Sequence, residues 1–272
     1  MAPAAPDSIA SAIARANSAG KQPVIFIHGL WLAPASWDRW AALFEEAGYA
    51  ALAPPWPGEA GDPAPETIER VVEHFAGIVE ALSSRPAIVG HSFGGLIAQI
   101  LAGRGLSAAT AAISPAPFQG VLPLPFSALR SAWPVLRNPA NLRRRVSLTP
   151  QEFRYAFANA VSAQESEALY RAHAVPAPGL PIFQAAAANF NRWSQARVES
   201  RAPCRGPLLI LSGEADHTVP PAVTRAAFKN QARNPHAVTE WASMAGRGHA
   251  LTIDAGWREV ADTALTFIKR FA

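Results

Sequence analysis

The stretch AIVGHSFGGLIAQI, residues 87–100, carries the clearest structural signal in the chain. A short apolar run comes first and is typical of a buried strand. Gly90, Ser92, Gly94 and Gly95 follow, and apolar residues then recur at the spacing of a helix. The stretch therefore predicts a strand, a tight turn and a helix, with Ser92 at the centre of the turn.

The glycines on either side of Ser92 have a steric explanation. In such a turn the central residue adopts a strained backbone conformation, and the residues two positions away crowd each other unless they lack side chains. Gly90 and Gly94 remove that crowding. The turn lifts Ser92 above the carboxyl edge of a parallel sheet, where folds of this kind bind their ligands. The pattern G-x-S-x-G is the nucleophile elbow, and it points to a serine nucleophile.

The rest of the chain alternates between strand-like and helix-like segments. Further strand-like runs lie at 24–27, 49–53, 108–113, 207–211 and 237–241. Helical patterns lie at 36–47, 65–83, 93–103, 220–231 and 254–271. Continuous apolar runs suit strands that are buried on both faces of a sheet. The alternation predicts a doubly wound α/β fold with a mostly parallel sheet of about six strands. Residues 7–19 are expected to form a helix or a loose arm.

One interval interrupts this alternation. Residues 115–203 contain no strand-like run, and they show helical patterns at 125–136, 149–159 and 162–173. An insertion of this length is too long for a plain loop. We therefore expect an α/β core, residues 1–114 and 204–272, and a helical cap, residues 115–203. The start of the cap, PAPFQGVLPLPF, is apolar and rich in turn residues, and we expect it to line a pocket.

Composition narrows the function classes. The chain has 272 residues, of which 50% are apolar and 16% are charged, so it can bury a large core. The net charge is +4, but the basic residues are scattered apart from Arg143, Arg144 and Arg145, and no nucleic-acid-binding module surrounds them. No apolar run approaches the length of a membrane span.

Other features of the sequence indicate a cytoplasmic location. The N-terminus lacks the basic start and apolar stretch of a secretory signal. Cys204 is the only cysteine, which excludes an internal disulfide and fits a reducing compartment.

A serine nucleophile needs a base, and the base needs an acid that orients it. Among the seven histidines, His249 lies in a glycine-flanked loop, GRGHALTID, between the last strand and the last helix. His28 precedes Gly29 at a strand end and is expected to be structural. Asp216 follows a buried strand in LLILSGEADHTVP, where Glu214 is its closest rival. The order Ser92, Asp216, His249 is the one expected for an elbow-based architecture.

Four motifs carry a family resemblance: VIFIHGLW at 24–31, GHSFGG at 90–95, SGEADHTVP at 212–220 and GRGH at 246–249. With them the chain resembles the α/β-hydrolase superfamily, in its serine-nucleophile, esterase- and lipase-like branch with a helical cap. The resemblance implies that the backbone N–H of Leu30, or of its neighbour Trp31, is one oxyanion donor. The N–H of Phe93 is implied as the other. Superfamily dehalogenases and epoxide hydrolases carry aspartate where Ser92 stands, which disfavours those reactions.

The expected activity is hydrolysis of a small-molecule carboxylic ester through an acyl-enzyme, with no metal and no organic cofactor. The expected pocket walls are aromatic and predict a substrate with an apolar acyl or alcohol group: Trp31, Phe93, Phe118, Phe126 and Trp133. Three alternatives stay open. The same triad acts on a lactone, thioester, amide or C–C bond, or it serves acyl transfer or perhydrolysis, or the chain is a non-catalytic binding protein.

Overall fold

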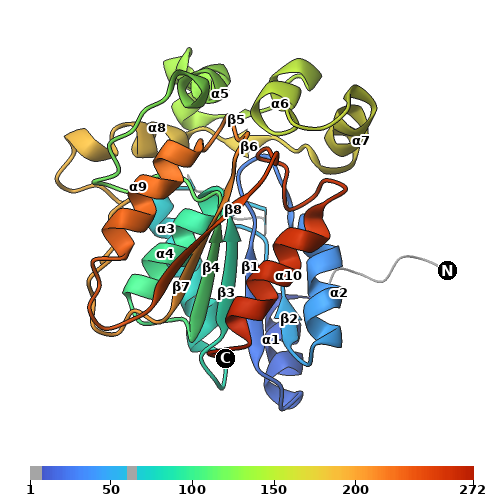
Figure 1. Cartoon of the computed structure of the whole chain (residues 1–272), viewed down its shortest axis with the longest axis vertical. Coiled ribbons are helices and arrows are strands. Elements are labelled where there is room, and N and C mark those ends of the chain that lie inside the picture. Colours follow the sequence, from blue (N-terminus) through green and yellow to red (C-terminus); the bar gives the residue numbers. More distant parts are fainter. Residues whose placement is uncertain (1–7, 60–65) are drawn as a thin grey trace.

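The structure is a computed structural model and describes residues 8–59 and 66–272. Its centre is a six-stranded sheet in the order β2-β1-β3-β4-β7-β8, in which every neighbouring pair is parallel (Figure 1). The strands are β1 (Pro23–Ile27), β2 (Ala50–Leu52), β3 (Ala87–His91), β4 (Ala109–Ile113), β7 (Leu208–Gly213) and β8 (Thr239–Met244). The predicted parallel sheet of about six strands is confirmed.

Strand β8 starts later than the sequence pattern predicts. The expected run began at Ala237, but Asn234 Oδ1 accepts hydrogen bonds from the N–H groups of His236, at 2.8 Å, and Ala237, at 3.2 Å. This side chain holds a turn there, so the strand begins at Thr239. As an edge strand that is only half-buried, β8 carries polar residues and has a weak apolar pattern.

Helices cover both faces of the sheet, as a doubly wound fold requires (Figure 1). On one face, α2 (Asp38–Glu46) and α10 (Trp257–Ile268) pack in one apolar core. On the other face, α3 (Ile68–Glu80), α4 (Phe93–Gly103) and α9 (Pro221–Gln231) pack in a second core. The short 3₁₀ helix η1 (Pro34–Trp37) precedes α2. Position 65, where the sequence pattern placed the start of α3, lies outside the described residues.

Helix α3 shows how the pattern produces the packing. Its buried residues include Ile68, Val71, Val72 and Phe75, which share one face at the i, i+3, i+4, i+7 spacing. The side chain of Thr67 caps the helix by accepting a hydrogen bond from the N–H of Arg70.

The N-terminal segment forms a helix, α1 (Ile9–Ser18), which was one of the two expected alternatives; Asp7 lies outside the described residues. Asn17 ties this helix to the core. Its side-chain amide donates to the Ala81 carbonyl at 3.0 Å, and its side-chain oxygen accepts from the Ser83 N–H at 2.8 Å. In the part of the chain that the structure describes, no helix is long and apolar enough to cross a bilayer.

The segment between β4 and β7 lies over one end of the sheet (Figure 1). It forms α5 (Phe126–Leu136), α6 (Pro150–Ala156), α7 (Ala163–His173) and α8 (Leu180–Ala186), with the 3₁₀ helices η2 (Pro139–Arg143) and η3 (Ala188–Phe190). We use the name cap for residues 115–203. The cap is mostly helical, but β5 (Arg145–Val146) and β6 (Ala177–Pro178) form a small antiparallel sheet that no strand-like run indicated. Two residues per strand are too few to give an apolar pattern.

Candidate active site

The turn between β3 and α4 holds Ser92 in a strained conformation. Its φ is 55° and its ψ is −120°, a region that residues with side chains rarely adopt. A Cβ on Gly90 would lie under 3.0 Å from the Gly94 carbonyl, and one on Gly94 would lie equally close to the Ile27 carbonyl. The two glycines therefore permit the turn, as the sequence analysis expected. The Ser92 N–H donates to the Ile113 carbonyl at 3.0 Å, which fastens the turn to β4.

His249 and Asp216 form a buried pair beside this turn. His249 Nδ1 lies 2.7 Å from Asp216 Oδ2, and both side chains are fully buried. Asp216 Oδ1 accepts hydrogen bonds from the backbone N–H groups of Thr218 and Val219, each at 2.8 Å. These bonds fix the carboxylate, so Nδ1 of His249 is the protonated nitrogen that donates to it. His249 Nε2 is buried and has no hydrogen-bond partner in residues 8–59 and 66–272.

The rival acid, Glu214, lies elsewhere. Its side chain is exposed, and its Oε1 accepts a hydrogen bond from Ser243 Oγ at 3.2 Å. The two loops that carry Asp216 and His249 meet at Gly213, where a Cβ would lie 2.6 Å from the Arg247 carbonyl. Asn159 of the cap closes this region by donating from its side-chain amide to the Ala215 carbonyl at 2.7 Å.

His91, the residue before Ser92, links the elbow to the histidine loop. Its ring centroid lies 4.7 Å from that of His249, and its Nε2 lies 2.9 Å from the His249 carbonyl oxygen. Burial lowers the pKa of His91 well below its ordinary value, and the nearby His249 lowers it further. His91 is therefore neutral, with its proton on Nε2, and it holds the His249 backbone in place.

The backbone N–H groups of Leu30, Trp31 and Phe93 make no hydrogen bond within the described part of the chain. The loop that carries Leu30 and Trp31 approaches the elbow closely, because a Cβ on Gly29 would lie 2.8 Å from Ser92 Cβ. Trp31 has a φ of 63°, so this loop turns sharply after Leu30. Phe93 is the first residue of α4, where free N–H groups favour negative charge.

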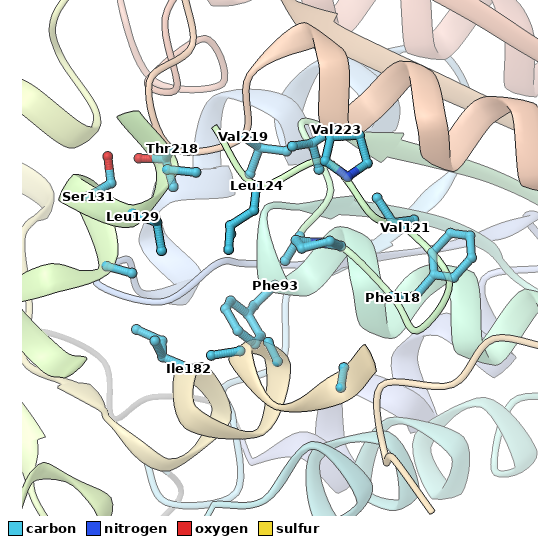
Figure 2. A pocket seen from close by; sticks show the side chains of 18 of the residues that line it. Phe93, Phe118, Val121, Leu124, Leu129, Ser131, Ile182, Thr218, Val219 and Val223 are labelled. Atoms are coloured by element: carbon cyan, nitrogen blue, oxygen red, sulfur yellow. The ribbon is translucent and has the colours of Figure 1, made fainter. Parts of the chain in front are cut away.

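An apolar cavity of about 420 Å³ opens beside Ser92 (Figure 2). Ser92 and Phe93 line it from the elbow, and Trp31 and Phe118 line other parts of its wall. Further walls come from α5, α8 and the residues after Asp216, among them Leu129, Ile182, Val219 and Val223. No sequence signal marked Ile182, because α8 has only seven residues and contains Pro181.

Two expected pocket walls, Phe126 and Trp133, do not line the cavity. Their exposed fractions are 78% and 60%. Both lie on α5, where Leu129, Ala132 and Leu136 face the cavity at the i, i+3, i+7 spacing. Phe126 and Trp133 are seven residues apart and share a neighbouring face that is exposed to solvent. The helix was predicted correctly, but the face that points into the pocket was not.

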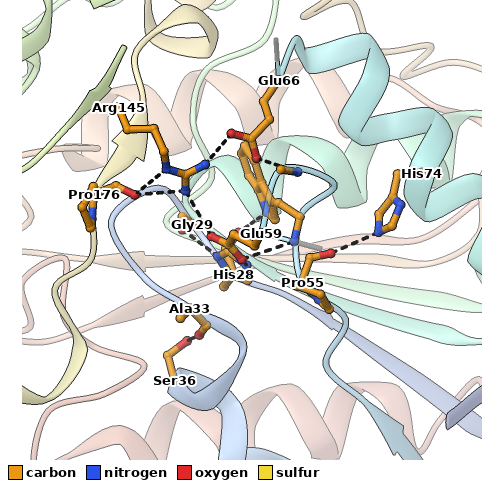
Figure 3. A network of polar contacts seen from close by, with 12 residues as sticks. His28, Gly29, Ala33, Ser36, Pro55, Glu59, Glu66, His74, Arg145 and Pro176 are labelled. Carbon is orange, nitrogen blue, oxygen red and sulfur yellow. Dashed lines mark hydrogen bonds and ion pairs between the residues drawn. The ribbon is translucent and has the colours of Figure 1, made fainter. Parts of the chain in front are cut away.

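A polar network joins the cap to the loop that precedes Leu30 (Figure 3). His28 Nδ1 donates to the Gly29 carbonyl at 2.9 Å, and its Nε2 lies 3.1 Å from Glu59 Oε2, which supports the expected structural role. Arg145 of β5 donates to Glu66 Oε2 at 2.7 Å and lies 3.5 Å from Glu59 Oε1. Burial raises the pKa of Glu66, and the charge of Arg145 opposes that rise.

Trp31 adds two further links between the cap and the core. Its ring Nε1 donates to the Val146 carbonyl at 2.9 Å, and its own carbonyl accepts from the Val175 N–H at 3.1 Å. The small cap sheet is therefore fastened to the loop that approaches Ser92. Within the described residues no cluster of three or more His, Cys, Asp or Glu side chains is arranged to bind a metal ion.

Comparison with known proteins identifies the family. The model of the alpha/beta hydrolase family matches residues 24–263, which is most of the chain. The chain therefore belongs to the alpha/beta hydrolase family, and the resemblance seen in the sequence is confirmed. A search of curated proteins found no match in sequence.

Solved structures with similar folds share little sequence with this chain. A monoacylglycerol lipase from Paleococcus ferrophilus has 20% identity and a TM-score of 0.65 over 92% of this chain and 95% of that chain. An extracellular alpha/beta-hydrolase from a Paenibacillus species has 17% identity and a TM-score of 0.68 over 90% and 98%. A pyrethroid hydrolase from Sphingobium faniae JZ-2 has 19% identity and a TM-score of 0.63 over 91% and 97%. At these identities the likeness establishes the fold.

Proposed function

We propose that this protein is a serine hydrolase that cleaves carboxylic esters with an apolar acyl or alcohol group. One observation carries the proposal. Ser92 sits on a strained turn at the wall of an apolar cavity, beside a buried His249–Asp216 pair whose outer nitrogen has no partner in the described residues. A nucleophile, a base and an orienting acid are the groups that acyl transfer needs.

In the proposed mechanism, His249 Nε2 takes the proton of Ser92 as the serine oxygen attacks the ester carbonyl. Asp216 holds the imidazole in the required tautomer and stabilises its cation. The N–H groups of Leu30 and Phe93 donate to the oxyanion. The alcohol leaves with a proton from His249, and water then attacks the acyl-enzyme by the reverse path. Trp31 and Phe118 contact the apolar part of the substrate in the cavity.

The alternative reactions use the same groups. A lactone, thioester, amide or C–C bond presents a carbonyl to the same nucleophile, so the triad alone does not select among them. The cavity is apolar, and none of the described residues that line it is charged, which favours an uncharged ester. Similar folds that are named as a lipase and a pyrethroid hydrolase support ester cleavage at the level of analogy.

The first test measures hydrolysis of p-nitrophenyl esters from acetate to palmitate with the wild-type protein and Ser92→Ala. We expect turnover by the wild type, with an optimum at short to medium acyl chains, and a loss of at least about 10³-fold in the variant. Retained turnover in Ser92→Ala contradicts the assignment of the nucleophile. If a fluorophosphonate labels Ser92 but no ester is turned over, the result supports cleavage of a lactone, thioester, amide or C–C bond instead. If Ser92 is not labelled, the result supports a non-catalytic binding role.

The acid is tested by a matched pair of variants. Asp216→Asn is expected to lower kcat by about 10³- to 10⁴-fold. The N–H groups of Thr218 and Val219 retain the amide oxygen, so the amide NH2 group faces His249 Nδ1 and favours the wrong tautomer. Glu214→Gln, in the same loop but exposed, is expected to leave kcat unchanged. The reverse result shows that the acid is Glu214.

A further inference from the structure

Exposed apolar side chains gather on the cap. Of the large apolar side chains that are exposed in the described residues, all except Val238 belong to the cap. We call this set the cap patch: Leu122, Leu124, Phe126, Leu129, Trp133, Leu142, Phe190 and Trp193. Phe190 is 93% exposed and Phe126 78%, values far from those of a packed core. A concentration of this kind marks a surface that binds an apolar partner.

The cap patch adjoins the cavity beside Ser92. Leu122, Leu124, Leu129 and Phe190 belong to the patch and also line the cavity. Figure 2 shows Leu124 and Leu129 at the cavity wall. Helices α5 and α8, which supply walls on two sides, are in contact with each other. The cavity therefore opens onto the patch, and a partner seated on the patch faces the cavity entrance.

The outer face of α5 alternates aromatic and cationic side chains. Phe126, Arg130, Trp133 and Arg137 follow one another at helical spacing, and all four are exposed. Near η3, the guanidinium of Arg192 lies 4.5 Å from the ring centroid of exposed Trp193. Aromatic side chains with arginine beside them suit the boundary between an apolar layer and anionic headgroups.

Charge is divided unevenly between the cap and the core. The cap contains 10 arginines and no lysine, against 4 glutamates and no aspartate, so its formal charge is +6. The rest of the chain has a formal charge of −2. The partner of the patch is therefore expected to be anionic as well as apolar. A second copy of the cap fits poorly, because two cationic surfaces would repel each other.

We propose that the cap patch docks on an anionic lipid surface, with the outer face of α5 and the segment around Phe190 and Trp193 in the interface. Phe126, Trp133, Phe190 and Trp193 enter the boundary of the acyl chains. The exposed Arg130, Arg137 and Arg192 contact lipid phosphates. This orientation presents the cavity entrance to apolar molecules dissolved in the lipid. The inference rests on the cap surface alone and does not depend on the reaction at Ser92.

The test is co-sedimentation of the protein with vesicles of phosphatidylcholine alone and of phosphatidylcholine with phosphatidylglycerol. We expect binding to the anionic vesicles and at least tenfold weaker binding of Phe126→Ser/Trp133→Ser. Arg130→Gln/Arg137→Gln is expected to weaken binding by about thirtyfold. The matched controls are Val238→Ser, an exposed apolar residue on the core, and Lys229→Gln/Arg233→Gln, which removes two charges from the core. Both controls are expected to bind as the wild type does.

A second measurement locates the contact. Tryptophan fluorescence is expected to shift to the blue with anionic vesicles and to be quenched by brominated acyl chains, and Trp133→Phe/Trp193→Phe is expected to abolish both effects. Equal thermal unfolding midpoints show that the variants are folded. The proposal is overturned by no binding to anionic vesicles, or by binding that the patch variants leave unchanged. It is also overturned by self-association at micromolar concentration that Phe126→Ser/Trp133→Ser abolishes, which indicates a second copy as the partner.

Discussion

His91 and His249 lie side by side in the interior, with ring centroids 4.7 Å apart, yet only His249 has a carboxylate partner. His91 faces a backbone carbonyl and no anion. Burial, and then the neighbouring His249, lower the pKa of His91, so His91 stays neutral in the site. Two neighbouring histidines thus have different partners: His249 pairs with a carboxylate, and His91 with a backbone carbonyl.

The lowered pKa of His91 predicts that the folded protein becomes less stable as the pH falls. Below pH 6.5 the unfolded chain takes up a proton at His91 that the folded chain excludes, because the pKa of His91 is lowered on folding. The free energy of unfolding therefore rises with pH. At a pH one unit below the unfolded-state pKa, one such histidine lowers this free energy by about 1.4 kcal/mol relative to its value at high pH. His74 and His173, whose pKa values burial also lowers, act in the same direction.

Urea unfolding at pH 7.5 and pH 5.5 isolates the contribution of His91. The wild type is expected to lose more stability between these two pH values than His91→Gln, which retains a side-chain donor and cannot titrate. Equal losses in the two proteins contradict a buried neutral His91.

At the scale of elements, the β3–α4 elbow is defined by close contacts of the backbone. The glycines at 90 and 94 leave no room for a Cβ against the neighbouring carbonyl oxygens, and in both cases the obstacle is backbone. A flexible side chain could move aside, but these carbonyls belong to the sheet and to the helix start. The turn therefore depends on glycine at both positions.

Gly94→Ala and Gly77→Ala make a matched pair for this element. Gly94→Ala is expected to lower the free energy of unfolding by at least about 3 kcal/mol, because the strand, the helix or both must shift. Gly77 lies inside α3, and apart from its chain neighbours and the helix's own backbone no atom of the described residues lies within 4 Å of the position that an alanine methyl group would take there. Gly77→Ala is therefore expected to stabilise the protein by about 0.5–1 kcal/mol. Urea unfolding measures both, and equal stabilities would show that the elbow tolerates a side chain.

The elements differ in how far the sequence predicts them, and the reason is physical. Helix α4 was predicted to the residue, because glycines mark its start and its apolar residues are local. Helix α5 was predicted in extent but not in orientation, because its cavity face and its neighbouring exposed face both carry large apolar side chains. The contact between Arg145 and Glu66 joins positions far apart in the chain, and no local pattern encodes it.

At the scale of the whole molecule, one group of polar contacts between the cap and the core surrounds the loop that carries Leu30. Arg145 reaches from β5 to Glu66 and Glu59, and the Trp31 ring reaches to Val146. The carboxylate of Glu66 is 6% exposed and depends on Arg145 for its counter-charge. Loss of this one cation is expected to affect the attachment of the cap.

Arg145→Met is expected to lower the free energy of unfolding by about 2 kcal/mol, because it leaves a buried carboxylate unpaired while the arginine itself is partly exposed. The control is Arg144→Met, an exposed neighbour, for which a change under about 0.5 kcal/mol is expected. In the Arg145→Met background, Glu66→Gln is expected to recover part of the loss. Unfolding by urea gives all three values, and an equal effect of Arg144→Met would contradict the link.

The order of the strands in the sheet also determines when each strand can pair with its neighbours during translation. Strand β4 pairs with β3, which precedes it in the chain, and with β7, which follows only after the segment 114–207. A ribosome adds about 5–20 residues per second, so β4 remains an unpaired sheet edge for roughly 5–20 seconds, although all its residues are buried in the finished fold. Such an edge invites pairing with other chains. The nascent protein is therefore most exposed to aggregation while its cap is being translated, which is the interval in which a chaperone matters most.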